Sequence, residues 1–195
     1  MKKTKTPLAL FVFVTGTIAS NPALGFDQPA AMRVGSLTSQ PIGHHWYCKE
    51  YSSDCSIKSS NQAPPKLTRG KWQELTEVNA YSNNSIRPVT DLEAYNRNEH
   101  WAYPVSFGDC EDYVLMKRHM LMQRGWPASA LLITVVRQKN GEGHAVLTVR
   151  TSKGDFILDN LDGKIRPWHA TPYRYLKRQA TNHSGKWSEI VDVRS

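Results

Sequence analysis

The sequence predicts an α+β fold in which a helix that begins at a cysteine packs on an antiparallel sheet. Helical periodicity is confined to the first part of the chain, where Trp72, Leu75, Val78 and Tyr81 recur at a spacing of three and a second apolar segment follows Cys110. Short apolar runs separated by turns occupy the second half. Helices followed by strands favour helices gathered on one face of an antiparallel sheet.

Two helices are expected. The first begins after Thr68, a residue type suited to the N-cap, and ends near residues 83–84, before Pro88 interrupts the chain. The second has the cysteine in its first turn and continues to Gln123, with Gly125 providing the glycine that commonly follows a helix.

Four strands are expected after these helices. The runs at residues 131–137, 144–150 and 156–159 are apolar or alternate polar with apolar side chains, and glycine-containing turns separate them, so they fit an antiparallel meander. A last strand is expected near residues 187–193.

The N-terminal segment, residues 1–25, is typical of a secretory signal peptide. Three lysines precede an apolar stretch that is short for a bilayer span, and small residues near Gly25 suit a signal peptidase. An uncleaved membrane anchor is the alternative. We expect export, to the periplasm if the source is Gram-negative, with residues 26–66 forming an N-terminal arm and disulfide loop and residues 67–195 forming the main domain.

The composition is that of a globular protein, with 39% hydrophobic and 22% charged residues. The formal net charge is +8, but the basic residues are scattered and no Lys/Arg run is interleaved with aromatic residues. The sequence therefore does not predict a nucleic-acid-binding protein.

The chain has three cysteines, Cys48, Cys55 and Cys110. In an oxidising compartment paired thiols are expected, and Cys48 and Cys55 are close enough in a loop-like stretch to close a short disulfide. Cys110 is then left over. A leftover thiol in an exported protein is intermolecular, buried and inert, or a reactive nucleophile.

Cys110, His144 and Asp159 together suggest nucleophilic catalysis. Unpaired N–H groups and the helix dipole at a helix start stabilise a thiolate. His144 opens one expected strand and Asp159 closes the next, so an antiparallel pair brings them together. The carboxylate can then orient the imidazole, which serves as the base for the thiol. Taken singly, each residue has an ordinary structural explanation; the combination favours a catalytic triad.

The motifs FGDCEDY, GHAVLTV and FILDNLDG resemble the bacterial transglutaminase-like cysteine peptidases, whose best-known branch is the LapG-type periplasmic proteases. The resemblance spans about residues 67–193. It implies a papain-like, transglutaminase-like core, a cysteine peptidase domain over residues 67–195, and the triad Cys110, His144 and Asp159.

The resemblance also implies calcium. The positions that match the family's calcium ligands are Asp109 and Glu111, with Asp112 as a further candidate; the alternative is that these acids complement the helix dipole. The family further implies a protein substrate, such as a surface adhesin, and an inner-membrane regulator. The histidines show no zinc-ligand spacing, so zinc is not expected.

Two other functions remain open at this point. The same triad could perform transglutaminase or deamidase chemistry, or the chain could be a catalytically silent binding module of the same fold.

Trp101 and Tyr103, upstream of the nucleophile, line either the substrate cleft or the core. Residues 173–175 could lie near the site or on a solvent-facing surface, and we interpret them as solvent-facing.

Overall fold

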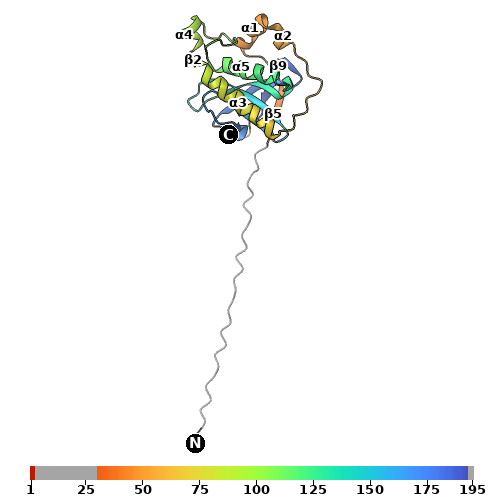
Figure 1. The fold of residues 1–195 in the computed structure, drawn as a ribbon, viewed down its shortest axis with the longest axis vertical. Coiled ribbons are helices and arrows are strands. Elements are labelled where there is room, and N and C mark those ends of the chain that lie inside the picture. Colours follow the sequence, from red (N-terminus) through yellow and green to blue (C-terminus); the bar gives the residue numbers. More distant parts are fainter. Residues whose placement is uncertain (3–29, 193–195) are drawn as a thin grey trace.

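The computed structural model describes residues 1–2 and 30–192 and shows a mixed α+β fold, with helices packed on a seven-stranded antiparallel sheet (Figure 1). The predicted signal peptide, residues 1–25, lies outside the described residues apart from its first two. Within the described part of the chain, no helix has the length and apolar character needed to cross a membrane.

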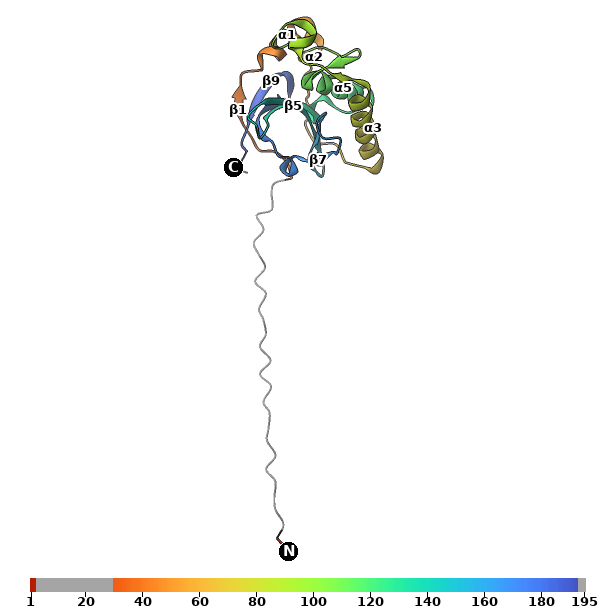
Figure 2. The ribbon, with the colours of Figure 1, turned by 90° about the vertical axis from the view of Figure 1, so that its left-hand side faces the viewer.

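The sheet has the strand order β1-β9-β8-β4-β5-β6-β7, and every neighbouring pair is antiparallel. Figure 2 shows that it is strongly curved. Its strands are β1 (Val34–Thr38), β4 (Leu131–Arg137), β5 (Gly143–Thr151), β6 (Gly154–Leu158), β7 (Arg166–Pro167), β8 (Arg174–Ala180) and β9 (His183–Ile190). A separate parallel pair joins β2 (Arg87–Pro88) to β3 (Phe107–Gly108).

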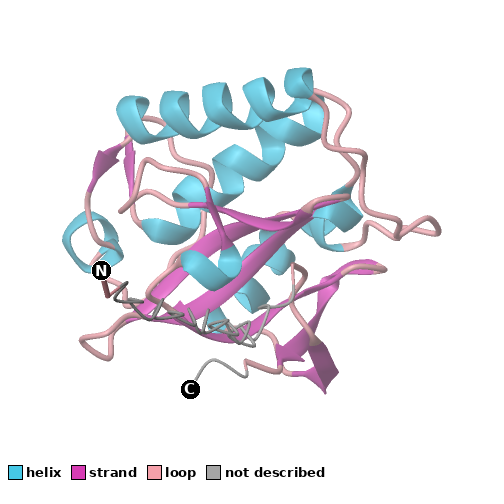
Figure 3. Ribbon diagram, turned by 90° about the horizontal axis from the view of Figure 1, so that it is seen from below, coloured by secondary structure: helices cyan, strands magenta, loops and turns pink. Residues whose placement is uncertain are grey.

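The helices form layers on the outer side of the curved sheet. Figures 2 and 3 show α5 lying against the central strands and α3 covering α5. The α-helices are α1 (Ile42–Glu50), α2 (Ser52–Cys55), α3 (Arg69–Ser85), α4 (Asp91–Tyr95) and α5 (Cys110–Gln123). Two 3₁₀ turns, η1 (Ala128–Ala130) and η2 (Trp168–Ala170), precede β4 and β8.

Local sequence signals explain the bounds of the two long helices. Thr68 caps α3 by accepting a hydrogen bond from the backbone N–H of Lys71 at 3.2 Å, as its residue type predicts. Gly125 follows α5 with a φ of 82°, the left-handed conformation that glycine adopts without a Cβ clash. Both predicted helices are therefore confirmed, with α5 beginning at Cys110 itself.

Alternation along β5 divides the core into two clusters. Ala145, Leu147 and Val149 face α5, whereas Val146 belongs to a second cluster on the opposite face of the sheet, with Trp168 among its members. Both faces of the central strands are thus buried, which fixes the register that places the ends of β5 and β6 side by side.

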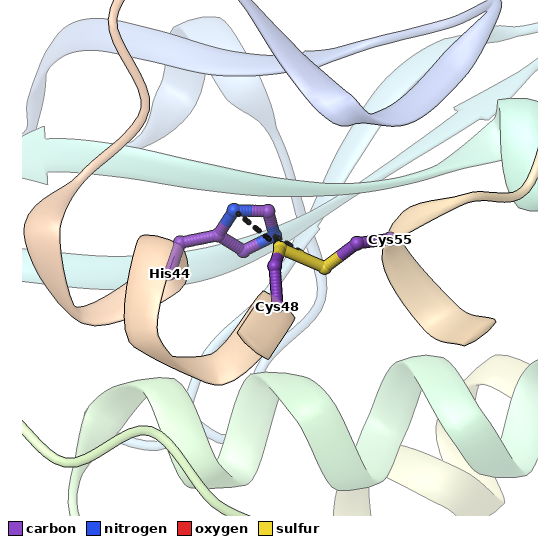
Figure 4. Close-up of side chains that lie close together, drawn as sticks. All are labelled: His44, Cys48 and Cys55. Atoms are coloured by element: carbon purple, nitrogen blue, oxygen red, sulfur yellow. Dashed lines mark hydrogen bonds between the residues drawn. A yellow bond between two sulfur atoms is a disulfide. The ribbon is translucent and has the colours of Figure 1, made fainter. Parts of the chain in front are cut away.

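Of the segment predicted to be an arm and a loop, residues 26–66, the structure describes residues 30–66, which contain a strand and two helices. The structure forms β1 at the edge of the main sheet and then α1 and α2, where the sequence predicts a polar loop around the two cysteines. The predicted disulfide is confirmed: Cys48 on α1 and Cys55 on α2 are bonded to each other. Figure 4 shows the ring of His44 lying against this disulfide.

Candidate active site

Cys110 is the first residue of α5, where the helix packs on β5 and β4. Asp109 is the N-cap residue of α5, but its side chain makes no capping hydrogen bond to the first turn of the helix. The thiol is partly buried and donates a hydrogen bond to Glu111 Oε2 at 3.1 Å. Burial, followed by the negative charges of Glu111 and Asp109, raises the pKa of Cys110 well above its ordinary value.

His144 and Asp159 form a buried pair at the adjoining ends of β5 and β6. The His144 Nε2 atom lies 2.8 Å from Asp159 Oδ1, and both side chains are almost fully buried. Burial opposes ionisation of Asp159, but the hydrogen bond and charge of His144 outweigh it and lower the pKa of the carboxyl group. An ionised carboxylate only accepts, so Nε2 carries the proton of this bond and Nδ1 is left for a second partner.

Among the described residues, no hydrogen bond joins the Cys110 sulfur to the His144 ring; the thiol proton is directed at Glu111 instead. The structure therefore shows an oriented imidazole–carboxylate pair and a helix-start thiol whose pKa is raised by burial and by the nearby acids. Such a site requires removal of negative charge around the thiol before a thiolate can form readily.

The acids around Cys110 form a compact cluster. Ligand-type oxygen atoms of Asp91, Asp109 and Glu111 all lie within 4.8 Å of one another. Burial and the proximity of the other acids raise the pKa of both Asp109 and Glu111, which shows that their negative charges are poorly compensated. The buried Asp109 Oδ1 also has no hydrogen-bond partner among the described residues. Buried oxygen ligands with uncompensated charge fit a hard divalent cation such as Ca²⁺.

The cluster differs in membership from the sequence prediction. Asp112, the further candidate, is not part of it: its Oδ1 accepts the backbone N–H of Ala102 at 2.9 Å, and burial first of all raises its pKa to about 7. Asp91, which opens α4, was missed because it lies 18 residues before Asp109 in the sequence. The parallel pairing of β2 with β3 brings the two acids together, and the sequence carries no signal for that contact.

Side chains from α3 and from the segment before β8 also bind Asp159. Asn83 on α3 donates from Nδ2 to the Asp159 backbone carbonyl at 2.8 Å, and Tyr173 donates from its hydroxyl to Asp159 Oδ2 at 2.5 Å. The interpretation of residues 173–175 as solvent-facing is wrong for Tyr173 and Tyr175, which are buried, and only Arg174 is exposed. The alternation of aromatic and charged residues is a strand signal that could have found them.

The aromatic residues upstream of the nucleophile serve the core. Trp101 is buried, with its ring against those of His44 and Trp187. Tyr103 is half-buried and donates its hydroxyl to Asp54 on α2. Their contacts hold α1 and α2 over the sheet.

These features define a class of protein: an α+β fold that presents a cysteine at the start of a central helix beside a histidine–carboxylate pair on an antiparallel sheet. Within that class, the chain belongs to the bacterial transglutaminase-like cysteine proteinase family (BTLCP), which it matches over residues 34–195.

Solved structures agree with this assignment. Legionella pneumophila LapG is similar with a TM-score of 0.51 and 27% sequence identity, covering 60% of this chain and 68% of that chain. Its calcium-bound form gives 0.53 and 26%, covering 67% and 74%. Its EGTA-treated form gives 0.52 and 26%, covering 63% and 72%. The comparison with curated proteins gives no match.

Proposed function

We propose that this protein is an exported cysteine peptidase whose triad consists of Cys110, His144 and Asp159. The observation that carries the proposal is the buried hydrogen bond between His144 and Asp159 beside the helix that begins at Cys110. Membership in a cysteine proteinase family supports it.

The chemistry follows from these three residues. Cys110 attacks a peptide carbonyl as its proton passes to His144, and the Cys110 backbone N–H, one of the free groups of the helix start, can donate to the oxyanion. His144 then protonates the leaving amine, and water attacks the acyl-enzyme to release the second product. Asp159 holds the imidazole in the orientation that both steps need.

Calcium is part of the proposal. Asp91, Asp109 and Glu111 are the residues that would hold it, and the bound ion would supply positive charge that offsets the acids facing the thiol. The likeness to a LapG structure determined with calcium supports this assignment.

The substrate is proposed to be a protein, of the surface-adhesin kind that the family resemblance implies, with an inner-membrane regulator as a partner. A periplasmic location accords with the predicted signal peptide and with the Cys48–Cys55 disulfide, a bond that persists in oxidising compartments.

The test is the rate at which iodoacetamide alkylates Cys110 in the purified protein, read by mass spectrometry between about pH 5 and 9, the range in which thiols and imidazoles titrate. In the presence of calcium, Cys110 should react faster than a free thiol, and His144→Ala should slow it by about tenfold or more because the base is lost. Reaction no faster than a free thiol, in calcium as in EGTA, would support the silent binding module instead.

Calcium should move this profile to lower pH, because neutralising Asp109 and Glu111 lowers the pKa of the thiol. Asp91→Asn should weaken the response of the profile to calcium, and it alters a residue that makes no hydrogen bond to the thiol. Glu142 is an exposed acid on the β4–β5 turn, so Glu142→Gln should leave the calcium response unchanged. A response that is equal in both variants would exclude the acidic cluster as the calcium site. Product analysis with and without an amine acceptor separates hydrolysis from acyl transfer.

A further inference from the structure

Both oxygens of the Asp159 carboxylate are occupied by hydrogen bonds. Oδ1 accepts from His144 Nε2 at 2.8 Å and from the backbone N–H of Leu161 at 3.0 Å. Oδ2 accepts from the Tyr173 hydroxyl at 2.5 Å. A buried carboxylate oxygen without a donor is costly, so each donor restricts the rotation of the group.

Tyr173 contacts both members of the pair. Its ring centroid lies 5.4 Å from that of His144, and its hydroxyl lies on Asp159. The ring belongs to the core cluster on the face of the sheet opposite α5. Packing in this cluster therefore holds the ring in place while it contacts the imidazole and the carboxylate.

We propose that Tyr173 is a positioning residue that fixes the orientation of the Asp159 carboxylate and, through it, of the His144 imidazole. This inference rests on the proposed function. By occupying Oδ2, the hydroxyl leaves Oδ1 as the oxygen that faces Nε2, which sets the imidazole with Nδ1 available for the thiol proton. As a neutral donor it also favours the ionised form of the carboxylate, the form that stabilises an imidazolium.

The charges around Asp159 give the direction of the pH effect. The titratable groups that face it are His144, Tyr173, Lys117 on α5 and Asp162 in the turn after β6. The hydrogen bond from Tyr173 is one of the contributions that lower the pKa of Asp159. Removing the hydroxyl therefore raises this pKa, and protonation of Asp159 ends the stabilisation of the imidazolium at a higher pH than in the parent protein.

The experiment compares Tyr173→Phe with Tyr175→Phe in the same calcium-containing alkylation assay. Tyr175 is a matched control, because it is a buried tyrosine two residues along the chain whose hydroxyl bonds Thr171 at 2.9 Å. In Tyr173→Phe the rate at neutral pH should fall about tenfold, as expected for loss of a hydrogen bond to a charged group. With the profile extended below about pH 4, the ordinary range of an aspartate, its acid side should also move up by about one pH unit, because Asp159 is protonated at a higher pH. Tyr175→Phe should change neither.

A second replacement keeps the test independent of any folding defect. Incorporating 3-fluorotyrosine at position 173 retains the ring and makes the hydroxyl a stronger donor, so the acid side of the profile should move to lower pH, opposite to the phenylalanine variant. Equal profiles for Tyr173→Phe and Tyr175→Phe, or no shift with fluorotyrosine, would overturn the inference while the proposed function stands. A parent protein whose Cys110 reacts like a free thiol would instead overturn the proposed function.

Discussion

Lys117 is a fully buried lysine on the nucleophile helix, two turns after Cys110. Its side chain is 0% exposed, and the Nζ atom has no hydrogen-bond partner among the described residues, although it lies 5.9 Å from the Tyr113 ring. Burial lowers the pKa of Lys117 to about 7, against an opposing influence of Asp159. An amine in this setting opposes folding wherever it is protonated in the unfolded chain.

This gives a pH-dependent prediction for stability. Between about pH 7 and 10.5 the unfolded chain binds the lysine proton and the folded chain does not, so this residue makes the free energy of unfolding rise with pH. Lys117→Met, which keeps the length and removes the amine, should stabilise the protein by about 1 to 3 kcal/mol near pH 6, with a gain that shrinks as pH rises.

Urea unfolding at several pH values measures this effect, and Lys153→Met, at an exposed turn position, is the control that should be neutral. A loss of stability in Lys117→Met at low pH would show that the ammonium is compensated in the folded protein.

At the scale of the elements, α1 depends on a glycine. A Cβ built on Gly43 would lie 2.3 Å from Trp101 Nε1 and 2.6 Å from Glu99 Oε2, so the helix can approach the buried tryptophan only because position 43 has no side chain. The approach places His44 and Tyr47 of α1 in the core beside Trp101. The tryptophan ring is itself packed against Trp187 and cannot move aside without disturbing the sheet.

Gly43→Ala should therefore destabilise the protein by about 1 to 3 kcal/mol, the usual cost of overpacking a core. Gly70→Ala is the matched control, because Gly70 is likewise the second residue of a helix and its Cβ would meet only Thr68 Oγ1, at 3.9 Å. Alanine should be neutral or slightly stabilising there, since it favours helix more than glycine does. Thermal unfolding followed by circular dichroism compares the two, and equal midpoints would contradict the packing argument.

How far the sequence predicts these elements depends on whether the signal is local. Thr68 and the apolar spacing that follows it predict α3, and the antiparallel meander predicts that His144 and Asp159 adjoin. The helix α1 was not predicted, because its burial runs against residue type: Trp46 is exposed while His44 is buried. Periodic patterns detect a helix that buries its apolar residues on one face, whereas α1 leaves both Ile42 and Trp46 exposed.

Contacts between segments far apart in the sequence also limit how much of the candidate site could be predicted. Asp91 joins the acidic cluster only through the β2–β3 pairing, and Tyr173 reaches Asp159 only because the chain returns to the sheet after β7. Such contacts are properties of the topology, and a single sequence without its fold carries no pattern for them.

Across the whole molecule, the Cys48–Cys55 disulfide connects the two small helices α1 and α2. The His44 ring lies against the disulfide, with Nδ1 3.5 Å from Cys48 Sγ and Nε2 3.8 Å from Cys55 Sγ. The same ring accepts a hydrogen bond from Trp187 Nε1 on β9. Burial, with a smaller influence of Arg118, lowers the pKa of His44 to about 3, so the ring is neutral and adds no charge to the core. The disulfide, the histidine and β9 form one packed unit that ties α1 and α2 to the sheet.

Removing the disulfide should therefore lower the stability of the whole fold. A bridge that closes a loop with a sequence separation of 7 restricts the unfolded chain by about 2.5 kcal/mol, which for a protein of this size lowers the melting temperature by about 5 to 10 °C. The double variant Cys48→Ser and Cys55→Ser should show this decrease in calorimetry, and dithiothreitol should bring the parent protein to the same value.

Cys110→Ser separates the disulfide from the remaining thiol, because it keeps the bridge and should keep the full response to dithiothreitol. If the reductant left the melting temperature of the parent and of Cys110→Ser unchanged while the double variant melted lower, the loss would come from the serines in the core. In that case the packing around His44, and not the covalent link, would hold α1 and α2 on the sheet.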